Sequence, residues 1–567
     1  MESHMENANR SEDADTIAVG SSDSSLRLEF APPELPLLRF WILSIGIFVG
    51  LLLSFLDTSI VATSLLAIGI EFEALTTANW VALAYSLSYL GCAVLFARIS
   101  DIIGRRDAFL VSYLIFIVFS LACGFAKNLT QLIAFRAVQG LGGSGLYSIT
   151  MTILPEIIPQ RLKKFLGGMI GIVVAMAGVL GPIFGGLLTE YTSWRWIFWM
   201  NGPIGGASML LFFLMWPKPQ YLPNIERRTW AELDYFGSIL IIGAAVLVVF
   251  PFQNIGTMTD QWSQAVFIIP LLAGVVLWLV LFAWSVFIEK RRSRTIAAAL
   301  PLRLLRNHVY AAAVLNTLLT GFPYLLIIYA FPLRLQIVNG QDSLLAGVML
   351  LPMLGSSAIG SVVSGAINGK GDRTFELQTV ASSFLVLGCG LLSTLSSSST
   401  LEPKALGFLV FVGLGFGIIV STSTIVAMVK SSNEDHASAQ GVMAEVRVLG
   451  GSIGIAASSA IVGVKIRDQV GISKDNWFPS PGGVSSDLTP TQQIAVRQAY
   501  SDAFSEGMAI CAIIGAFAVL VSLMMLGQKK LTAAEHMERH SKEKMREKKS
   551  SQSLRAPIDS TVFSTAH

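Results

Sequence analysis

The sequence predicts an all-α polytopic membrane protein, and three observations lead to this fold class. Of the 567 residues, 53% are hydrophobic and 14% are charged, whereas about 25% of residues are charged in an ordinary soluble domain. The apolar residues are gathered into blocks of roughly 20 or more, long enough to cross a hydrocarbon layer about 30 Å thick as helices. Cationic residues gather in alternate connections between these blocks, which is typical of multi-pass membrane proteins.

Fourteen apolar blocks are predicted to span the membrane, and the even number places both chain ends on one side. The connections on that side hold most of the cationic residues, such as Arg105 and Arg106 and the run at 290–306. The opposite connections hold at most one apiece, apart from the long loop before the last span. Both termini are therefore predicted to be cytoplasmic. The spans are centred near residues 53, 88, 117, 141, 176, 206, 244, 275, 322, 354, 386, 415, 451 and 515.

The two ends of the chain are predicted to be cytoplasmic tails. Residues 1–36 are rich in Ser, Asp and Glu without an early apolar core, which favours a disordered tail over a cleaved signal peptide. Residues 528–567 carry a mixed-charge stretch and a Ser-rich end. The formal charge of +3 gives no indication of nucleic-acid binding. No Ser/His/Asp arrangement, metal-ligand spacing or nucleotide loop is found, so we predict no enzyme, catalytic residue, metal or cofactor.

Asp57 and Arg136 are predicted to lie at similar depth in the membrane. Asp57, in "FLDTSIVATSL", is about four residues outward of the middle of the first span, and Arg136 is about five residues outward in the fourth. A guanidinium at that depth costs several kcal/mol unless it faces a partner. One interpretation is a structural salt bridge. The other is proton coupling, in which Asp57 gains and loses a proton as water access alternates and Arg136 tunes that exchange.

The stretch "ARISDIIGRRDAF" forms the predicted turn between the second and third spans. Gly104 allows the bend, and Arg105 and Arg106 alone are ordinary topology signals. Asp101 needs a partner, because a carboxylate at a membrane edge is costly without one. The group is therefore either a topology signal or a cytoplasmic gate that latches another helix end and releases it.

The stretch "GVLGPIFGG" places one proline and four glycines inside the predicted fifth span. Gly178, Pro182 and Gly186 recur at every fourth position, and Gly181 and Gly185 form a second row. In lipid, neighbouring helices compensate for the hydrogen bond that proline removes, and glycine allows close helix packing. Small-residue faces are common in helix bundles, but this spacing with proline is more specific.

Four further polar residues inside the predicted spans are candidates for lining a cavity or a gate: Gln139, Asn201, Glu445 and Arg447. Asn201 follows "WRWIFWM", which is typical of the aromatic belt at a membrane surface. Glu445 and Arg447 lie near the inner end of the thirteenth span, where a structural pair is an equal alternative.

These stretches together resemble the major facilitator superfamily, and specifically its fourteen-span drug:proton antiporter group of fungal-type multidrug and toxin efflux pumps. "LDTSIV", "SDIIGRR", "RAVQGLGG" and "GVLGPIFGG" resemble motifs of the first span, the loop after the second span, the fourth span and the antiporter segment. "WRWIFWMNGP" resembles a signature of the fourteen-span branch. Ala97 and Ala177 depart mildly from the pattern, since the loop and antiporter motifs usually begin with glycine.

The resemblance implies a major facilitator fold with two six-helix bundles, at 37–217 and 308–527, and two linker helices at 234–288. A substrate cavity would lie between the bundles and open alternately to each side. Asp101 and Arg105 would hold the cytoplasmic side shut in the outward-facing state. Gly181, Pro182 and Gly185 would form a close, bendable seam at the bundle interface.

The predicted function is proton-coupled export of small amphipathic or apolar molecules, such as drugs, toxins or secondary metabolites, by alternating access. Few charges near the midplane and many aromatic residues favour such cargo over nitrate or phosphate. The alternative is an uptake or vacuolar transporter of siderophores or basic amino acids, and a non-transporting receptor would carry a larger cytoplasmic domain. The predicted partners are a small-molecule substrate, protons and the lipid bilayer, without nucleic acid. The expected location is the plasma membrane, as a monomer, with the vacuolar membrane as the alternative.

Overall fold

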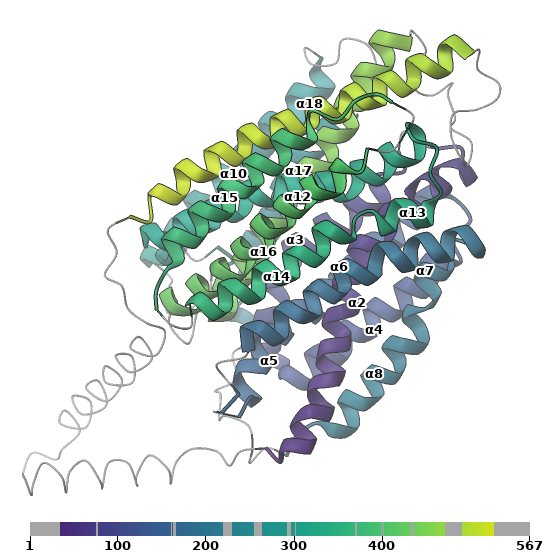
Figure 1. Ribbon diagram of the computed structural model, residues 1–567. Helices are drawn as coiled ribbons and strands as arrows, with labels where there is room; N and C mark the ends of the chain where they lie inside the picture. The colour runs from purple at the N-terminus through teal and green to yellow at the C-terminus, as the bar shows by residue number, and fades with distance from the viewer. Residues whose placement is uncertain are drawn as a thin grey trace, which may run out of the picture.

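The computed structural model describes residues 35–526 with several gaps. These gaps fall at 75–76, 160, 163–165, 219–220, 222–228, 255–263, 292–295, 297, 301, 369–370, 399, 401, 432–435 and 471–489. The predicted tails at 1–36 and 528–567 lie outside the described residues, apart from 35 and 36. The described residues are organised as long helices that run roughly alongside one another (Figure 1).

The helices fall into three consecutive groups. The N-terminal half contains α2 (Leu37–Glu71), α3 (Trp80–Ile103), α4 (Arg105–Gly124), α5 (Leu129–Ile157), α6 (Leu166–Tyr191), α7 (Trp196–Trp199) and α8 (Asn201–Met215). The linker pair is α9 (Tyr235–Asn254) and α10 (Ala265–Arg291), preceded by the short η3 (Trp230–Glu232) and followed by α11 (Leu302–Leu305). The C-terminal half contains α12 (His308–Ile337), α13 (Ser343–Val348), α14 (Leu351–Asn368), α15 (Thr374–Leu392), α16 (Lys404–Lys430), α17 (His436–Val470) and α18 (Pro490–Leu523).

All fourteen predicted span centres lie inside helices, but not all of these helices are apolar by composition. Among the described residues, 12 helices are long and apolar enough to cross a membrane, or 13 if α3 counts as one span. The α3 helix bends by 51° between Trp80–Ala93 and Leu95–Ile103. The remaining helix, α5, is rich in glycine and polar residues and carries Arg136.

The composition of α5 follows from its place between other helices. A Cβ on Gly140 would lie 2.5 Å from the Tyr85 carbonyl oxygen of α3, and a Cβ on Gly142 would lie 2.5 Å from the Phe116 nitrogen of α4. The glycines therefore let two neighbouring backbones approach closely. Because these helices cover α5, it does not need the apolar surface of a lipid-facing helix.

The two halves lie side by side, with the purple and blue N-terminal helices on one side and the green and yellow C-terminal helices on the other (Figure 1). They meet where α6 packs on α13 and α14, α3 on α17, and α2 on α12. The α2 helix begins and α18 ends at the same end of the molecule, which we call the near end (Figure 1). The near end is the cytoplasmic end in the predicted topology, and the opposite end is called the far end.

The halves are in close contact at the far end. A Cβ on Gly186 of α6 would lie 2.6 Å from the Ser343 carbonyl oxygen of α13, and one on Gly347 of α13 would collide with the Pro182 carbonyl oxygen. We call this contact between α6 and α13 the far-end seam. The Asn79 side chain also donates a hydrogen bond to the Ser459 hydroxyl of α17. The two halves are therefore joined at the far end in two places, where α6 contacts α13 and where Asn79 contacts α17.

The linker pair lies on one flank of the molecule, where α9 contacts α3, α10 and α17. The buried Asp234 carboxylate holds this region together by accepting three hydrogen bonds. Its Oδ1 accepts from the Gly237 backbone N–H at 2.8 Å and from the Trp284 Nε1 at 2.8 Å, and its Oδ2 accepts from the Ala299 N–H at 3.0 Å. One side chain thus joins the start of α9 to α10 and to the segment that follows α10.

Replacing Asp234 with alanine is expected to destabilise the linker pair by about 1–3 kcal/mol, because buried donors would lose their acceptor. Asp234→Asn keeps one acceptor oxygen and is expected to lose less. Thermal unfolding of the purified full-length protein measures both changes, with the exposed Asp107→Ala as control. An unchanged unfolding temperature in Asp234→Ala would contradict this role.

Candidate functional site

The predicted pair of Asp57 and Arg136 is formed in the N-terminal half. Arg136 of α5 donates from Nη1 to Asp57 Oδ2 of α2, and both side chains have an exposed fraction of 0%. The two residues meet because α2 and α5 pack against each other with these positions at the same level. The pair is a fully desolvated ion pair, so removing either partner would leave an uncompensated buried charge.

Gln139 and Asn201 complete the surroundings of the Asp57 carboxylate. Gln139 donates from Nε2 to Asp57 Oδ1 at 3.0 Å, and its own Oε1 accepts from Arg136 Nη1 at 3.0 Å. Asn201 of α8 approaches the same Oδ1 at 3.4 Å and donates to the Ser120 hydroxyl at 2.9 Å. We call Asp57, Arg136, Gln139 and Asn201 the charge cluster. Both carboxylate oxygens of Asp57 therefore accept from side chains of α5 and α8.

Two aromatic rings enclose the Arg136 guanidinium. Its central carbon lies 4.3 Å from the ring centroid of Tyr85 and 5.6 Å from that of Phe198. Arg136 Nε donates to the Val81 carbonyl oxygen at 3.0 Å, and the Tyr85 hydroxyl donates to the Ser54 carbonyl oxygen at 2.9 Å. Arg136 Nη2 has no hydrogen-bond partner among the described residues. The Tyr85 ring therefore replaces part of the solvation that the guanidinium loses.

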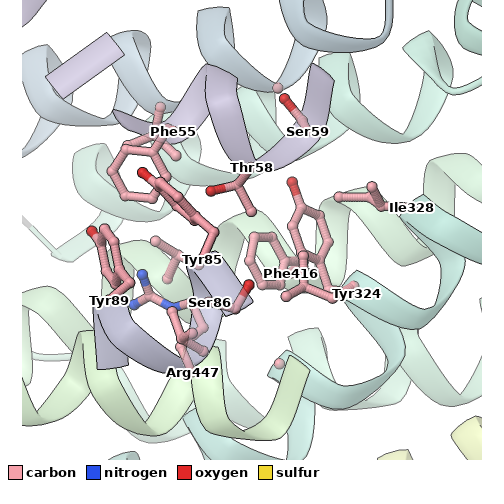
Figure 2. Close-up of a pocket in the computed structure, with 16 residues that line it drawn as sticks. Phe55, Thr58, Ser59, Tyr85, Ser86, Tyr89, Tyr324, Ile328, Phe416 and Arg447 are labelled. Carbon is pink, nitrogen blue, oxygen red and sulfur yellow. The ribbon is translucent and has the colours of Figure 1, made fainter. Parts of the chain in front are cut away.

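A cavity lies between the two halves (Figure 2). It encloses about 800 Å³ of empty space, including its open part, and residues of α2, α3, α6, α12, α16 and α17 line it. The rings of Tyr324 and Phe416 stack at 3.4 Å between centroids with planes 2° apart. The aromatic lining residues are Phe55, Tyr85, Tyr89, Tyr324 and Phe416.

Tyr85 contacts the charge cluster and also lines the cavity. Its ring covers Arg136 on one side and lines the cavity on the other. Thr58 and Ser59, which follow Asp57 on α2, also line the cavity. The hydroxyl of Tyr329 on α12 donates to the Thr58 carbonyl oxygen at 2.6 Å and joins α2 to the other half. A rearrangement of the charge cluster would therefore change the cavity wall through α2 and through the Tyr85 side chain.

The predicted cytoplasmic gate forms a cluster at the near end. Gly104 has φ 102°, a conformation that L side chains rarely adopt, which explains glycine at this turn. Arg105 donates to Asp101 from Nη1, and its Nη2 lies 3.2 Å from Glu156 Oε1. All these residues belong to the N-terminal half, and no hydrogen bond or salt bridge joins Asp101 or Arg105 to a described residue of the other half. The latch between halves that the sequence predicts is thus not engaged in this structure.

Arg106 does not join the gate cluster. Its guanidinium lies over the ring of Phe213 on α8, 4.5 Å from the centroid. Glu156, by contrast, is a member that sequence reasoning missed. A carboxylate at the inner end of a predicted span, opposite a cationic turn, is the signal that could have identified it.

The glycines of the antiporter segment divide between two faces of α6. Gly178 and Gly186 face the C-terminal half, where a Cβ on Gly178 would lie 3.2 Å from Leu354 Cδ2. Gly181 and Gly185 face α2 of their own half, where a Cβ on either residue would collide with the Ser59 hydroxyl or the Ile60 carbonyl oxygen. The structure therefore corrects the predicted seam. Its interface row is Gly178, Pro182 and Gly186, because positions four apart share one helix face.

Glu445 and Arg447 face different surroundings on α17. Arg447 lines the cavity, whereas Glu445 is 5% exposed and does not line it. Arg447 forms no salt bridge with any residue that the structure describes. Residues two apart on a helix do not face each other, which accounts for the different surroundings of the two side chains.

The chain matches the family model of the Major Facilitator Superfamily at residues 47–259 and 236–455. With its helical fold and the cavity between its halves, the chain belongs to the major facilitator superfamily, a family of membrane transporters. The sequence prediction of a transporter, and not an enzyme, is confirmed.

Several curated relatives carry names of transporters and efflux pumps. The chain is 30% identical over 531 residues to an MFS-type transporter of Fusarium mangiferae, covering 90% of this chain and 87% of that protein. It is 31% identical over 421 residues to an efflux pump of Dothistroma septosporum, covering 74% and 71%. It is also 30% identical over 376 residues to multidrug resistance protein 3 of Bacillus subtilis, covering 66% and 70%.

Solved structures of the same fold have low sequence identity to the chain. A bacterial homolog to the human lysosomal transporter Spinster, inward-facing and unoccupied, superposes with a TM-score of 0.57 at 16% identity, covering 86% of this chain and 98% of that chain. An auto inhibited POT family peptide transporter gives 0.59 at 13% identity, covering 87% and 98%. These likenesses concern the fold alone.

Proposed function

We propose that the protein exports small amphipathic or apolar molecules in exchange for protons, by alternating access between the two halves. The observation that carries the proposal is the buried charge cluster that shares Tyr85 with an aromatic cavity. The names of two relatives, an efflux pump and a multidrug resistance protein, support the outward direction.

Proton coupling would operate through the Asp57–Arg136 pair. Protonation of Asp57 removes the negative charge that compensates Arg136, so the guanidinium must find other partners or move. Because the Tyr85 ring lies over that guanidinium and also lines the cavity, its movement changes the cavity wall. Substrate and proton then favour different arrangements of the same side chains, which is the requirement for exchange.

Alternating access would use the contacts at the two ends in turn. In this structure the far-end seam is shut, and the Asp101–Arg105 pair is held within the N-terminal half. In the opposite state the far-end seam separates, and this pair becomes the latch of the near end. We place the near end in the cytoplasm of a plasma-membrane protein that acts as a monomer, because the cationic loops lie at that end and one chain carries both halves.

Basic amino acids, one of the alternative cargoes, are disfavoured by the charge of the cavity. The described lining contains one cation and no acidic side chain. A cationic substrate would enter without a compensating carboxylate.

The test of this function is transport by inside-out vesicles that carry the full-length protein. Fluorescent drugs and candidate metabolites are offered with and without a proton gradient that is acidic inside. Accumulation that requires both the protein and the gradient is the expected result. Accumulation of the same compounds without the gradient, or none for the whole panel, would overturn the proposal.

A further inference from the structure

We propose that the cavity recognises an aromatic molecule that carries one anionic group, with Arg447 as the counter-charge of that anion. The inference rests on the proposed function for the cavity's role as the substrate site, and it adds the chemical class of the substrate.

Arg447 is the one charged side chain in the described cavity lining. Its Nε is buried without a hydrogen-bond partner, and the guanidinium has no salt-bridge partner among the residues that the structure describes. A partly buried cation without a partner is unfavourable, because it loses water and gains no compensating charge. A carboxylate or sulfonate in the cavity would supply that charge and accept up to two N–H bonds in a fork.

The backbone beneath Arg447 is held by close helix packing. A Cβ on Gly321 of α12 would collide with the Arg447 carbonyl oxygen, so the two backbones are in direct contact at this position. From that fixed base the side chain points toward Tyr89 of α3, with Ser86 nearby (Figure 2). The cation therefore lies where α17 packs against α3, so an anion paired with it would sit between the two halves.

Neither of the two nearby carboxylates, Glu445 and Asp57, serves as the counter-charge of Arg447. Glu445 on the same helix is 5% exposed and does not line the cavity. Asp57 is occupied by Arg136, Gln139 and Asn201, and the Tyr85 ring lies between that cluster and the cavity. The positive charge of Arg447 is thus not cancelled by an acidic side chain facing the cavity.

The remaining wall suits a flat apolar body. The stacked rings of Tyr324 and Phe416 and the ring of Phe55 line the cavity together with aliphatic side chains (Figure 2). Aromatic rings pack well against such a wall, with offset or edge-to-face geometry. One cation beside an aromatic wall selects an aromatic monoanion over a neutral analogue, and either of these over a cation.

The test uses two fluorescent probes that share the same aromatic body. One is 8-anilinonaphthalene-1-sulfonate, which stays anionic at every working pH, and the other is the neutral N-phenyl-1-naphthylamine. Binding of each probe to the full-length protein in lipid nanodiscs is measured at equilibrium, with empty nanodiscs as background. Mutual displacement of the probes shows that they share one site.

Arg447→Gln is expected to weaken binding of the sulfonate at least about tenfold while the neutral probe binds within about twofold of wild type. Arg447→Lys keeps the charge and is expected to recover most of the sulfonate affinity. Arg291→Gln, at the exposed end of α10, is the matched control and is expected to change neither probe. Equal losses for both probes in Arg447→Gln would assign Arg447 a structural role, and an unchanged sulfonate affinity would exclude it as the counter-charge.

Equilibrium binding needs no gradient, so this experiment is independent of proton coupling. If the probe preference holds while vesicles fail to use a proton gradient, the proposed mode of transport is wrong and the anion site stands. If gradient-driven export holds while Arg447→Gln leaves the preference unchanged, only the anion site is wrong.

Discussion

Replacing Asp57 with asparagine is expected to reduce proton-gradient-driven export by at least about 100-fold. Asparagine keeps the shape of the side chain and an oxygen for Arg136, but it cannot exchange a proton at working pH. Export is measured in inside-out vesicles with a substrate that the wild type transports. The control is Asp107→Asn, which neutralises an exposed carboxylate in the first turn of α4 and is expected to export normally.

The loss must be separated from misfolding, because Asp57→Asn leaves Arg136 buried without its counter-charge. Breaking one side of a buried ion pair costs about 3–5 kcal/mol. The double variant Asp57→Asn with Arg136→Gln removes both charges and is expected to recover thermal stability without recovering coupled export. Normal gradient-driven export by a folded Asp57→Asn protein would remove Asp57 from the coupling mechanism.

Placing leucine at Gly186 is expected to abolish transport while the protein remains folded. The new side chain would meet the Ser343 carbonyl oxygen, from which a Cβ alone would be 2.6 Å away, and would hold the far-end seam apart. Each half keeps its own packing, so thermal unfolding is expected to change little. Single cysteines placed on α6 and α13 and labelled with spin probes would report a seam that stays open.

The matched variants separate closure of the seam from packing inside one half. Gly206→Leu is the control, since a Cβ there meets no atom within 4 Å, and it is expected to transport normally. Gly181→Leu is expected to lower both stability and transport, because its side chain would strike α2 beside Ser59. Wild-type transport by Gly186→Leu would show that the seam does not need to close.

Sequence reasoning could find the centre of the site because depth in a membrane follows from position in a span. Asp57 and Arg136 lie at matching levels in antiparallel spans, and a buried guanidinium demands a partner, so their pairing follows from spacing and cost. Gln139 and Asn201 could be singled out as polar residues in apolar spans, although their shared partner, Asp57, could not be named.

Spacing alone could not fix how each helix is rotated about its axis. The two glycine rows on α6 lie one residue apart along the chain but face different halves, and only the packed structure assigns them. For the same reason, spacing could not show that Arg447 lines the cavity while Glu445 does not. It also could not show that Tyr85 contacts both Arg136 and the cavity. Apolar composition also fails to identify α5 as a membrane span, because its polar surface is covered by other helices and does not face lipid.

Proton coupling is tested by the movement of protons against substrate in proteoliposomes. Vesicles loaded with a pH-sensitive dye, at equal pH on both sides and with the membrane potential clamped, receive a sudden substrate gradient. Wild-type protein is expected to move protons in the opposite direction to substrate, and Asp57→Asn is expected to move none. Substrate flow without any change in lumenal pH in the wild type, or undiminished proton flow in Asp57→Asn, would contradict it.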